Sequence, residues 1–266
     1  MAVGIITGSG TYALPDFVDA TAEQVGTRWG EVTVTRGRLA GAEALHVSRH
    51  GPGHARLSNH VAFRANVAAL RQAGADCVIG CTACGAVDPA VPLGSLVVFD
   101  DLHFLANRLP DGEICTFFSE PGDPARAHWI YQDPFSAGVR AALLVAAGEA
   151  GQTVRDGGCY GHVDGPRFNT RAEIRGLAAC GVTAVSQTGG PETVLCGELA
   201  LPYALIGFAT DYANGVLPGD PTPVEELTGL LAASSGAFAA TLARAVPALA
   251  AAPPAPPGVV YRIGAP

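Results

Sequence analysis

Short apolar runs alternate along this chain with longer stretches whose apolar residues recur at a helical spacing. The runs have the length of buried strands, and the periodic stretches have the length of helices. The expected strands are Val3–Ile6, Val32–Thr35, Ala44–Val47, Cys77–Cys81, Leu96–Phe99, Cys159–Val163, Val182–Ser186 and Tyr203–Ala209. The expected helices are Asn59–Ala73, Ser136–Glu149, Thr170–Ala179, Glu192–Leu199 and Val224–Ala245. This alternation predicts an α/β fold in which helices flank a central mixed β-sheet.

The 266 residues contain no internal repeat and no linker that would divide them, so we expect a single domain. Within it, Val32–Thr35 and Ala44–Val47 are expected to pair as a hairpin. The last segment, Pro253–Pro266, is rich in proline and alanine and cannot continue a helix. We therefore place the domain at residues 1–250 and an extended Pro/Ala-rich tail at residues 251–266.

The composition restricts the class of protein. Hydrophobic residues make up 48% of the chain and charged residues 15%, which is typical of a well-buried globular protein. The net charge of −8 argues against a nucleic-acid binder. No apolar run of about 18 residues stands out, and the N-terminus lacks the features of a signal peptide, so neither a membrane protein nor an exported one is expected.

The seven cysteines are odd in number and scattered, which indicates reduced thiols and a cytoplasmic location. Cys81 and Cys84 form a single C-x-x-C motif. No second pair and no histidine stands at zinc-finger spacing, so we expect no metal there. Both residues are better explained as small buried side chains at the end of a strand.

Three short segments after expected strands have features that suit an anion. Gly8-Ser9-Gly10 would let backbone N–H groups and a hydroxyl approach it. Arg49 and His50 would offer a planar fork and a further donor. Thr82 and Ala83 stand beside a glycine in a third such turn. Each has an ordinary alternative, namely a glycine turn or, for Arg49, a surface salt bridge.

Two further positions suit a flat, polar ligand. Phe168 follows a glycine–proline turn and could stack on an aromatic base or belong to the core. Asp211 follows an apolar strand almost directly, where a partly desolvated carboxyl would have a raised pKa and could donate a proton; a turn or helix cap is the alternative. Thr170 and Glu173 have the spacing of a capping box.

Taken in order, the segments GIITGSG, SRHGPGH, NHVAFRANVAALRQAGAD, CTACGAV, DGPRFNTRAE, SQTGGPE and ATDY resemble the trimeric purine nucleoside phosphorylase and methylthioadenosine phosphorylase family. The resemblance extends from Val3 to about Ala245. It implies that inorganic phosphate cleaves a purine nucleoside. It also implies that no metal or organic cofactor is required, that phosphate is a co-substrate, and that the active unit is a homotrimer.

The resemblance also implies roles for single residues. The phosphate ligands would be Ser9, Arg49, His50, Thr82, Ala83 and Thr188. The base would lie against Phe168 and face Asp211, which would share a proton with N7 of the purine. Gln187 stands where the family usually has a methionine beside the ribose. His128 would complete the 5' pocket of a neighbouring subunit.

The choice of base rests on two positions. Relatives that act on 6-oxopurines carry glutamate where this chain has Asn169, and asparagine where it has Asp211. An aspartate can accept from a 6-amino group, so 5'-methylthioadenosine is the expected substrate. Ala213 replaces a second aspartate that adenine-specific relatives often carry, and Asn214 stands beside it. The alternatives are a 6-oxopurine phosphorylase, a nucleosidase that uses water, a dinucleotide-dependent oxidoreductase and a non-catalytic nucleoside-binding protein.

Overall fold

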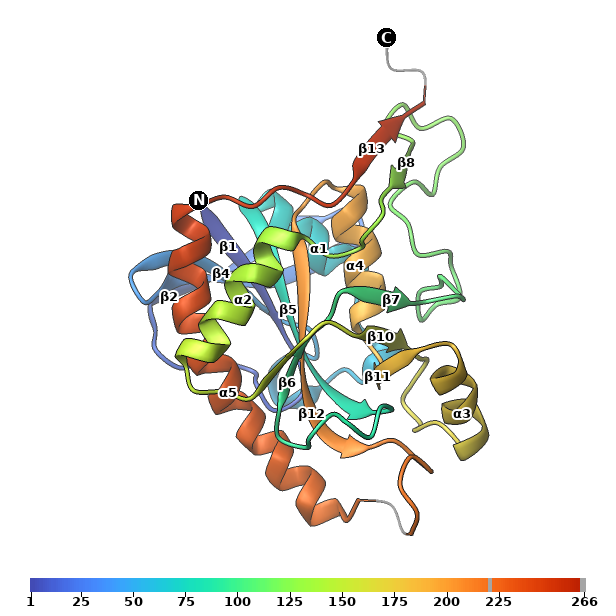
Figure 1. The fold of residues 1–266 in the computed structure, drawn as a ribbon. Helices are drawn as coiled ribbons and strands as arrows, with labels where there is room; N and C mark the ends of the chain where they lie inside the picture. Colours follow the sequence, from blue (N-terminus) through green and yellow to red (C-terminus); the bar gives the residue numbers. More distant parts are fainter. Residues whose placement is uncertain (220–221, 264–266) are drawn as a thin grey trace.

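The computed structural model describes residues 1–219 and 222–263. Its centre is an eleven-stranded mixed sheet in which eight strands follow the order β2-β3-β4-β1-β5-β11-β10-β7, while β12 pairs with β5, β6 with β12 and β9 with β6 (Figure 1). The strands of this sheet are β1 (Ala2–Thr7), β2 (Phe17–Thr27), β3 (Gly30–Leu39), β4 (Ala42–Ser48), β5 (Ala75–Ala86), β6 (Leu96–Val98), β7 (Asp101–His103), β9 (Val154–Asp156), β10 (Cys159–His162), β11 (Val182–Ser186) and β12 (Tyr203–Tyr212).

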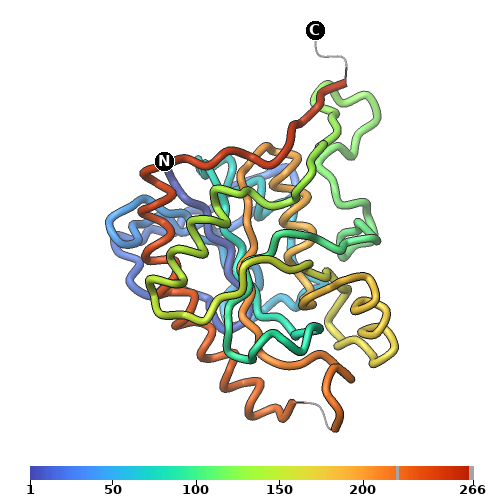
Figure 2. Tube along the Cα trace, in the orientation of Figure 1, coloured from blue at the N-terminus to red at the C-terminus, as the bar shows by residue number. Residues whose placement is uncertain are grey.

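Helices cover both faces of the sheet, as Figure 2 shows along the chain trace. Helices α2 (Ala137–Glu149) and α5 (Val224–Ala251) pack against each other on one face. Helices α1 (Phe63–Gln72) and α4 (Gly189–Glu198) pack together on the other, and α3 (Arg171–Ala179) lies against β11. The predicted α/β fold with a mixed sheet and flanking helices is confirmed.

The sequence of β1 follows from the fact that helices cover the sheet on both faces. All six of its residues are buried. Ile5 packs into the core on the α2/α5 side, and Ile6 packs into the core on the α1/α4 side. A strand with two covered faces needs apolar side chains at every position, so it appears as a continuous run rather than an alternating one. The predicted β3–β4 hairpin is also confirmed, with Thr35 opposite His46.

Several boundaries differ from the sequence prediction. Strand β2 was not expected, because its mostly exposed polar residues show no apolar alternation. The helix expected from residue 59 begins at Phe63, and a short 3-10 helix, η2 (Ser58–His60), precedes it. Strand β5 continues to Ala86, so Thr82 and Ala83 lie within a strand and not in a turn.

The C-terminal segment is more ordered than an extended tail. Helix α5 continues to Ala251, where the predicted domain boundary lies. Strand β13 (Val259–Arg262) then pairs antiparallel with β8 (Ala127–Ile130), forming a two-stranded arm that projects from the domain in Figure 1. Residues 264–266 of the predicted tail lie outside the described residues.

Helix α5 also bears on the membrane expectation. By length and composition alone it could cross a membrane, which contradicts the expectation that no such stretch exists. In the structure one side of the helix is buried, with Phe238, Leu242 and Leu249 in the core beside α2. Such packing is what the core helix of a globular domain shows.

Candidate active site

One cavity of about 310 Å³ gathers most of the predicted site residues. Its walls come from the ends of several sheet strands, the loop after β10, and the first half of α5. Ten predicted residues line it: Ser9, Arg49, His50, Thr82, Ala83, Phe168, Asn169, Gln187, Thr188 and Asp211. Clefts at strand ends are the usual ligand sites of α/β sheets.

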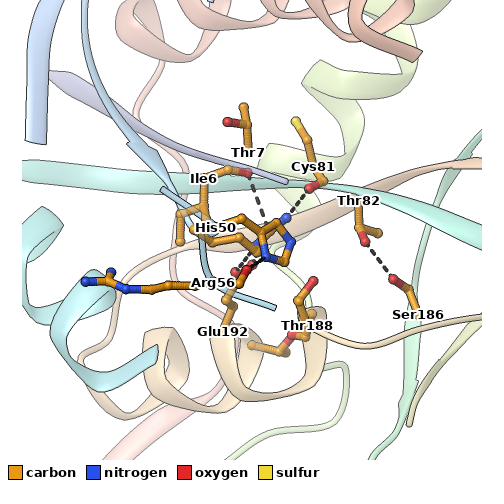
Figure 3. A network of polar contacts seen from close by, with 12 residues as sticks. Ile6, Thr7, His50, Arg56, Cys81, Thr82, Ser186, Thr188 and Glu192 are labelled. Atoms are coloured by element: carbon orange, nitrogen blue, oxygen red, sulfur yellow. Dashed lines mark hydrogen bonds and ion pairs between the residues drawn. The ribbon is translucent and has the colours of Figure 1, made fainter. Parts of the chain in front are cut away.

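A gap between two strands opens the floor of this cavity. On one side β5 is paired with β12 along almost its whole length. On the other side β1 pairs with β5 only as far as Gly80, and β11 pairs with it only from Gly85. On this second side, the stretch between, which includes Thr82 and Ala83, therefore has no strand paired with it. Thr82 Oγ1 lies 2.9 Å from Ser186 Oγ across this gap (Figure 3).

Arg49 lies at the base of the gap, but its fork does not face the cavity. Its Nε and Nη2 donate to the two carboxylate oxygens of Glu192 at 2.6 and 2.9 Å. Nη1 donates to the carbonyl of Cys81, and Nη2 approaches the carbonyl of Ile6; Figure 3 shows Glu192, Cys81 and Ile6 around this point. The expected two-pronged contact of Arg49 with phosphate is therefore not what the structure shows.

The Arg49–Glu192 pair is almost completely removed from solvent, with 1% and 0% of the two side chains exposed. Burial acts against the charge of Arg49, but the ion pair with Glu192 outweighs it and raises the pKa of the guanidinium. Tyr203 Oη also donates to Glu192 at 3.0 Å. Arg49 does form a salt bridge, but the pair is buried, so the alternative of a surface salt bridge is wrong.

The first glycine loop makes room for this arrangement. A Cβ on Gly8 would collide with Arg49 Nη1, so only glycine fits there. Gly10 has φ near +82°, and a Cβ at that position would lie 2.6 Å from the carbonyl of Leu231 in α5. Ser9, between them, lines the cavity. The next residues form a loop and then β2, not the helix that a dinucleotide fingerprint requires.

His50 is oriented by a backbone carbonyl. Its Nδ1 lies 2.8 Å from the carbonyl oxygen of Arg56, so the proton must be on Nδ1. Burial and the nearby charge of Arg49 lower the pKa of His50 to about 4, so it is neutral at pH 7. The neutral ring then has its Nε2 left as an acceptor, where the sequence had suggested a donor. His54 stacks on it with the ring centroids 4.1 Å apart.

Asp211 lies near the end of β12 and lines the same cavity. The register of β12 against β5 shifts between Ala209 and Asp211, and such a bulge re-aims the side chain that follows it. Thr210 Oγ1 donates to Oδ1 of Asp211 at 2.8 Å. Burial raises the pKa of this carboxyl, and the bond from Thr210 opposes the rise. The predicted strand-end carboxyl with a raised pKa is confirmed, and Asp211 caps no helix.

Phe168 belongs to the cavity and not to the core, because 62% of it is exposed and it lines the open wall. The amide of Asn169 donates to Glu173, 3.3 Å away. The amide of Asn214 donates to the backbone carbonyl of Asn169 at 2.7 Å. Thr170 and Glu173 form the predicted capping box at the start of α3.

Thr188 and His128 differ in their placement. Thr188 precedes α4, is 4% exposed, and its backbone N–H points to Tyr160 Oη. His128 lies on β8 in the projecting arm and does not line this cavity. It lies instead on a second, shallower hollow that also includes Trp129 and Glu198.

The sequence of residues 2–247 matches the model of the phosphorylase superfamily. The chain belongs to this superfamily. It is 34% identical over 249 residues to the probable 6-oxopurine nucleoside phosphorylase of Thermococcus kodakarensis, and the alignment covers 92% of this chain and 91% of that protein. It is 36% identical over 220 residues to the S-methyl-5'-thioadenosine phosphorylase of Mycobacterium tuberculosis, with coverage of 82% and 78%.

Solved structures show the same relationship. The methylthioadenosine phosphorylase from Schistosoma mansoni, in complex with adenine, superposes with a TM-score of 0.84 at 26% identity, covering 94% of this chain and 92% of that chain. The predicted membership of the nucleoside phosphorylases is thereby confirmed. The oxidoreductase alternative is wrong, since the chain matches the phosphorylase superfamily and β1 is followed by a loop and β2 rather than by a helix.

Some residues in or beside the cavity of this phosphorylase were not predicted. Glu192 was assigned only to a helix, although a carboxylate within a mostly apolar helix indicates a buried partner. Ser58 belongs to η2 and lines the cavity. In the sequence it stands just before a predicted helix and gave no sign of this role. Thr210 was passed over beside Asp211, and its hydrogen bond to that carboxyl gave no separate sequence signal.

Proposed function

We propose that this protein is a purine nucleoside phosphorylase whose preferred substrate is 5'-methylthioadenosine, converted with phosphate to adenine and 5-methylthioribose 1-phosphate. The observation that carries the choice of base is the state of Asp211. Its Oδ1 is held by Thr210, which leaves Oδ2 available to a ligand, and burial raises its pKa, which favours the protonated carboxyl relative to an exposed aspartate. A carboxyl in that state suits N7 of a purine.

Asn169 and Asn214 each use one side-chain N–H within the protein, donated to Glu173 and to the backbone carbonyl of Asn169. These bonds orient both amides, and the choice of a 6-amino base rests on the carboxyl of Asp211. Asp211 then acts as proton donor to N7 when the glycosidic bond breaks, and as acceptor toward a 6-amino group. The relative from Mycobacterium tuberculosis and the structure from Schistosoma mansoni carry names that agree with this choice.

Phosphate is proposed to bind in the gap beside β5. Ser9, Thr82 and Thr188 supply hydroxyl groups, and Ala83 belongs to the stretch of β5 that has a paired strand on one side only. Arg49 contributes positive charge from below, and the neutral His50 accepts a hydrogen bond from the P–OH group of monohydrogen phosphate. From there an oxygen of phosphate attacks C1' while the N9–C1' electron pair leaves with the purine, which takes the proton from Asp211. No cofactor enters this scheme.

The active unit is proposed to be a homotrimer in which His128 reaches the 5' pocket of a neighbouring chain. His128 lies outside its own cavity, on the arm formed by β8 and β13. The same arm carries exposed apolar side chains, with Ile130 and Val259 55% and 63% exposed. Apolar groups exposed on a projecting hairpin favour an interface that covers them.

The test is release of free base from methylthioadenosine, methylthioinosine and inosine, each with and without phosphate. We expect phosphate-dependent release and the highest kcat/KM for methylthioadenosine. A preference of about tenfold or more for either 6-oxo substrate, equal to about 1.4 kcal/mol at the transition state, would contradict the assigned base pocket. Release without phosphate would indicate a nucleosidase instead.

A further inference from the structure

Gln187 bridges two loop segments that both contribute residues to the wall of the cavity. Its carboxamide oxygen accepts a hydrogen bond from Ser58 Oγ at 2.8 Å, and its carboxamide nitrogen donates to the backbone carbonyl of Arg167 at 3.1 Å. Ser58 belongs to the short helix η2, and Arg167 belongs to the loop after β10. Both ends of one planar amide are thus fixed, which holds the two loops at a set separation.

The surrounding residues are shaped to this bridge. A Cβ on Gly165 would collide with both Gln187 Oε1 and Ser58 Oγ, so the amide occupies the space that a side chain at residue 165 would need. Ser58 is only 7% exposed, so its hydroxyl has little access to water as an alternative partner. A bond in such a place contributes more than the same bond on the surface.

The loop that carries Phe168 is held from its other side as well. The guanidinium of Arg167 makes two bonds to Glu173, at 2.9 and 2.7 Å, and Glu173 also completes the capping box of α3. The backbone at Arg167 is therefore fixed by α3 on the outside and by Gln187 on the inside. Phe168 is the next residue, and its ring lines the cavity without burial to hold it.

We propose that Gln187 is a positioning residue that sets the place of Phe168 for the purine, rather than a direct ligand of the sugar. The inference rests on the proposed function, in which Phe168 stacks on the base. The two bonds use one N–H and one lone pair of the Gln187 amide and fix its orientation between Ser58 and Arg167. The bridge holds the backbone next to Phe168, while Thr82 and Ala83 of the proposed phosphate site lie on β5.

The decisive variant is Gln187→Met, which keeps a similar volume and removes both hydrogen bonds. We expect KM for the nucleoside, and Kd for free adenine measured by calorimetry, to rise about tenfold, since two modest bonds are lost. KM for phosphate and kcat should stay within about twofold, because the chemistry depends on other groups. Equal increases in both KM values would overturn the proposal.

Ser58→Ala separates positioning from direct contact. If the bridge is what matters, Ser58→Ala raises KM for the nucleoside in the same direction, and adding it to Gln187→Met changes little further, because the bond is already absent. If Ser58→Ala leaves both the nucleoside KM and the adenine Kd unchanged while Gln187→Met raises them, Gln187 contacts the ligand directly and the proposal fails. Thermal unfolding of each variant monitors folding, and Ser58→Ala carries the test if Gln187→Met does not fold.

Measurements of adenine binding also distinguish a failure of this proposal from a failure of the proposed function. Adenine binding can be measured whether or not the protein cleaves a nucleoside. Wild-type protein that binds adenine but releases no base from any nucleoside would contradict the phosphorylase function alone. A wild-type affinity for adenine in both Gln187→Met and Ser58→Ala would contradict the positioning role alone.

Discussion

The guanidinium of Arg49 and the carboxylate of Glu192 form a two-pronged ion pair at 2.6 and 2.9 Å, buried beneath the proposed phosphate site. The pair joins the end of β4 to α4 and neutralises the one arginine below the gap beside β5. An incoming anion must therefore compete with the carboxylate of Glu192 for the positive charge of Arg49. Glu192 is in this sense a counter-ion that regulates how strongly Arg49 attracts phosphate.

Glu192→Gln is expected to destabilise the fold and to strengthen the effect of phosphate. The amide cannot balance the charge of Arg49, and loss of one partner of a buried pair costs about 3–5 kcal/mol of unfolding free energy. Phosphate would supply the missing negative charge, so it should raise Tm more in the variant than in the wild type. Urea and thermal unfolding with and without phosphate measure both effects.

Glu43→Gln is the matched control, because Glu43 pairs with Arg36 on the surface. An exposed pair of this kind contributes about 0–1 kcal/mol. If the two variants lose similar stability, or if phosphate stabilises Glu192→Gln no more than wild type, the counter-ion role of Glu192 is excluded.

Asp211→Asn is expected to lower kcat with methylthioadenosine by about 10²–10⁴-fold, the usual contribution of a general acid, with a smaller change in KM. It should also narrow the preference over inosine, since the amide can donate to a 6-oxo group. Steady-state kinetics with both substrates test this. A change confined to KM would show that Asp211 binds the base without donating a proton.

Thr210→Val should move the pH profile in a defined direction. Burial raises the pKa of Asp211 and the bond from Thr210 lowers it, so removal of the hydroxyl raises the pKa further. A general acid must be protonated, and activity falls as the pH rises through its pKa. The falling limb of kcat/KM should therefore shift to higher pH in Thr210→Val. A shift to lower pH would contradict the assigned role of this carboxyl.

The parts that the sequence predicted are those with a local physical signal. Strand β1 and the first part of β12 carry continuous apolar runs, and the capping box of Thr170 and Glu173 has a fixed spacing. Strand β2 was missed because its residues face solvent and lack a period, and β13 because prolines precede it. The pairing between segments that are far apart in the sequence could not be predicted, because no local pattern encodes it.

The candidate site shows the same division. Strand-end polar residues such as Ser9 and Asp211 were identified from the residue type and its place after an apolar run, and both line the cavity. The buried ion pair of Arg49 was not predicted, because its partner Glu192 lies 143 residues away along the chain. The position of Thr82 within β5 likewise follows from its pairing with β12, which the glycine beside it does not reveal.

Stability should fall as the pH drops below 6.5. Burial lowers the pKa of His46 to about 4, of His50 to about 4 and of His162 to about 3, with the charge of Arg49 adding to the first two. Between pH 6.5 and 4 the unfolded chain binds protons that the folded chain does not, so the unfolding free energy rises with pH across that window and levels off above it. The raised pKa values of Glu198 and Asp211 act in the opposite direction.

Urea unfolding between pH 4 and 8 measures this dependence. His162→Leu removes one such group, whose Nδ1 is buried without a hydrogen-bond partner. The slope of unfolding free energy against pH should become shallower in the variant below pH 6.5, whatever happens to its stability at pH 8. An unchanged slope would mean that His162 is protonated in the folded protein, contrary to the lowered pKa.

Mixed oligomers give the sharpest test of His128. If each site combines Asp211 of one chain with His128 of a neighbour, Asp211→Asn and His128→Ala inactivate different halves of the same site. Each variant alone should be impaired with methylthioadenosine, and co-expression of the two should restore activity in mixed trimers, where some sites receive both intact residues. Mixing the finished oligomers without exchange of subunits should restore nothing, which serves as the control. Sedimentation should give a trimer for both variants. His128→Ala changes the arm, but it leaves in place the exposed apolar residues Ile130 and Val259, which are proposed to form the interface. A fully active monomer, or co-expressed variants no more active than the sum of the two alone, would place His128 outside the active site.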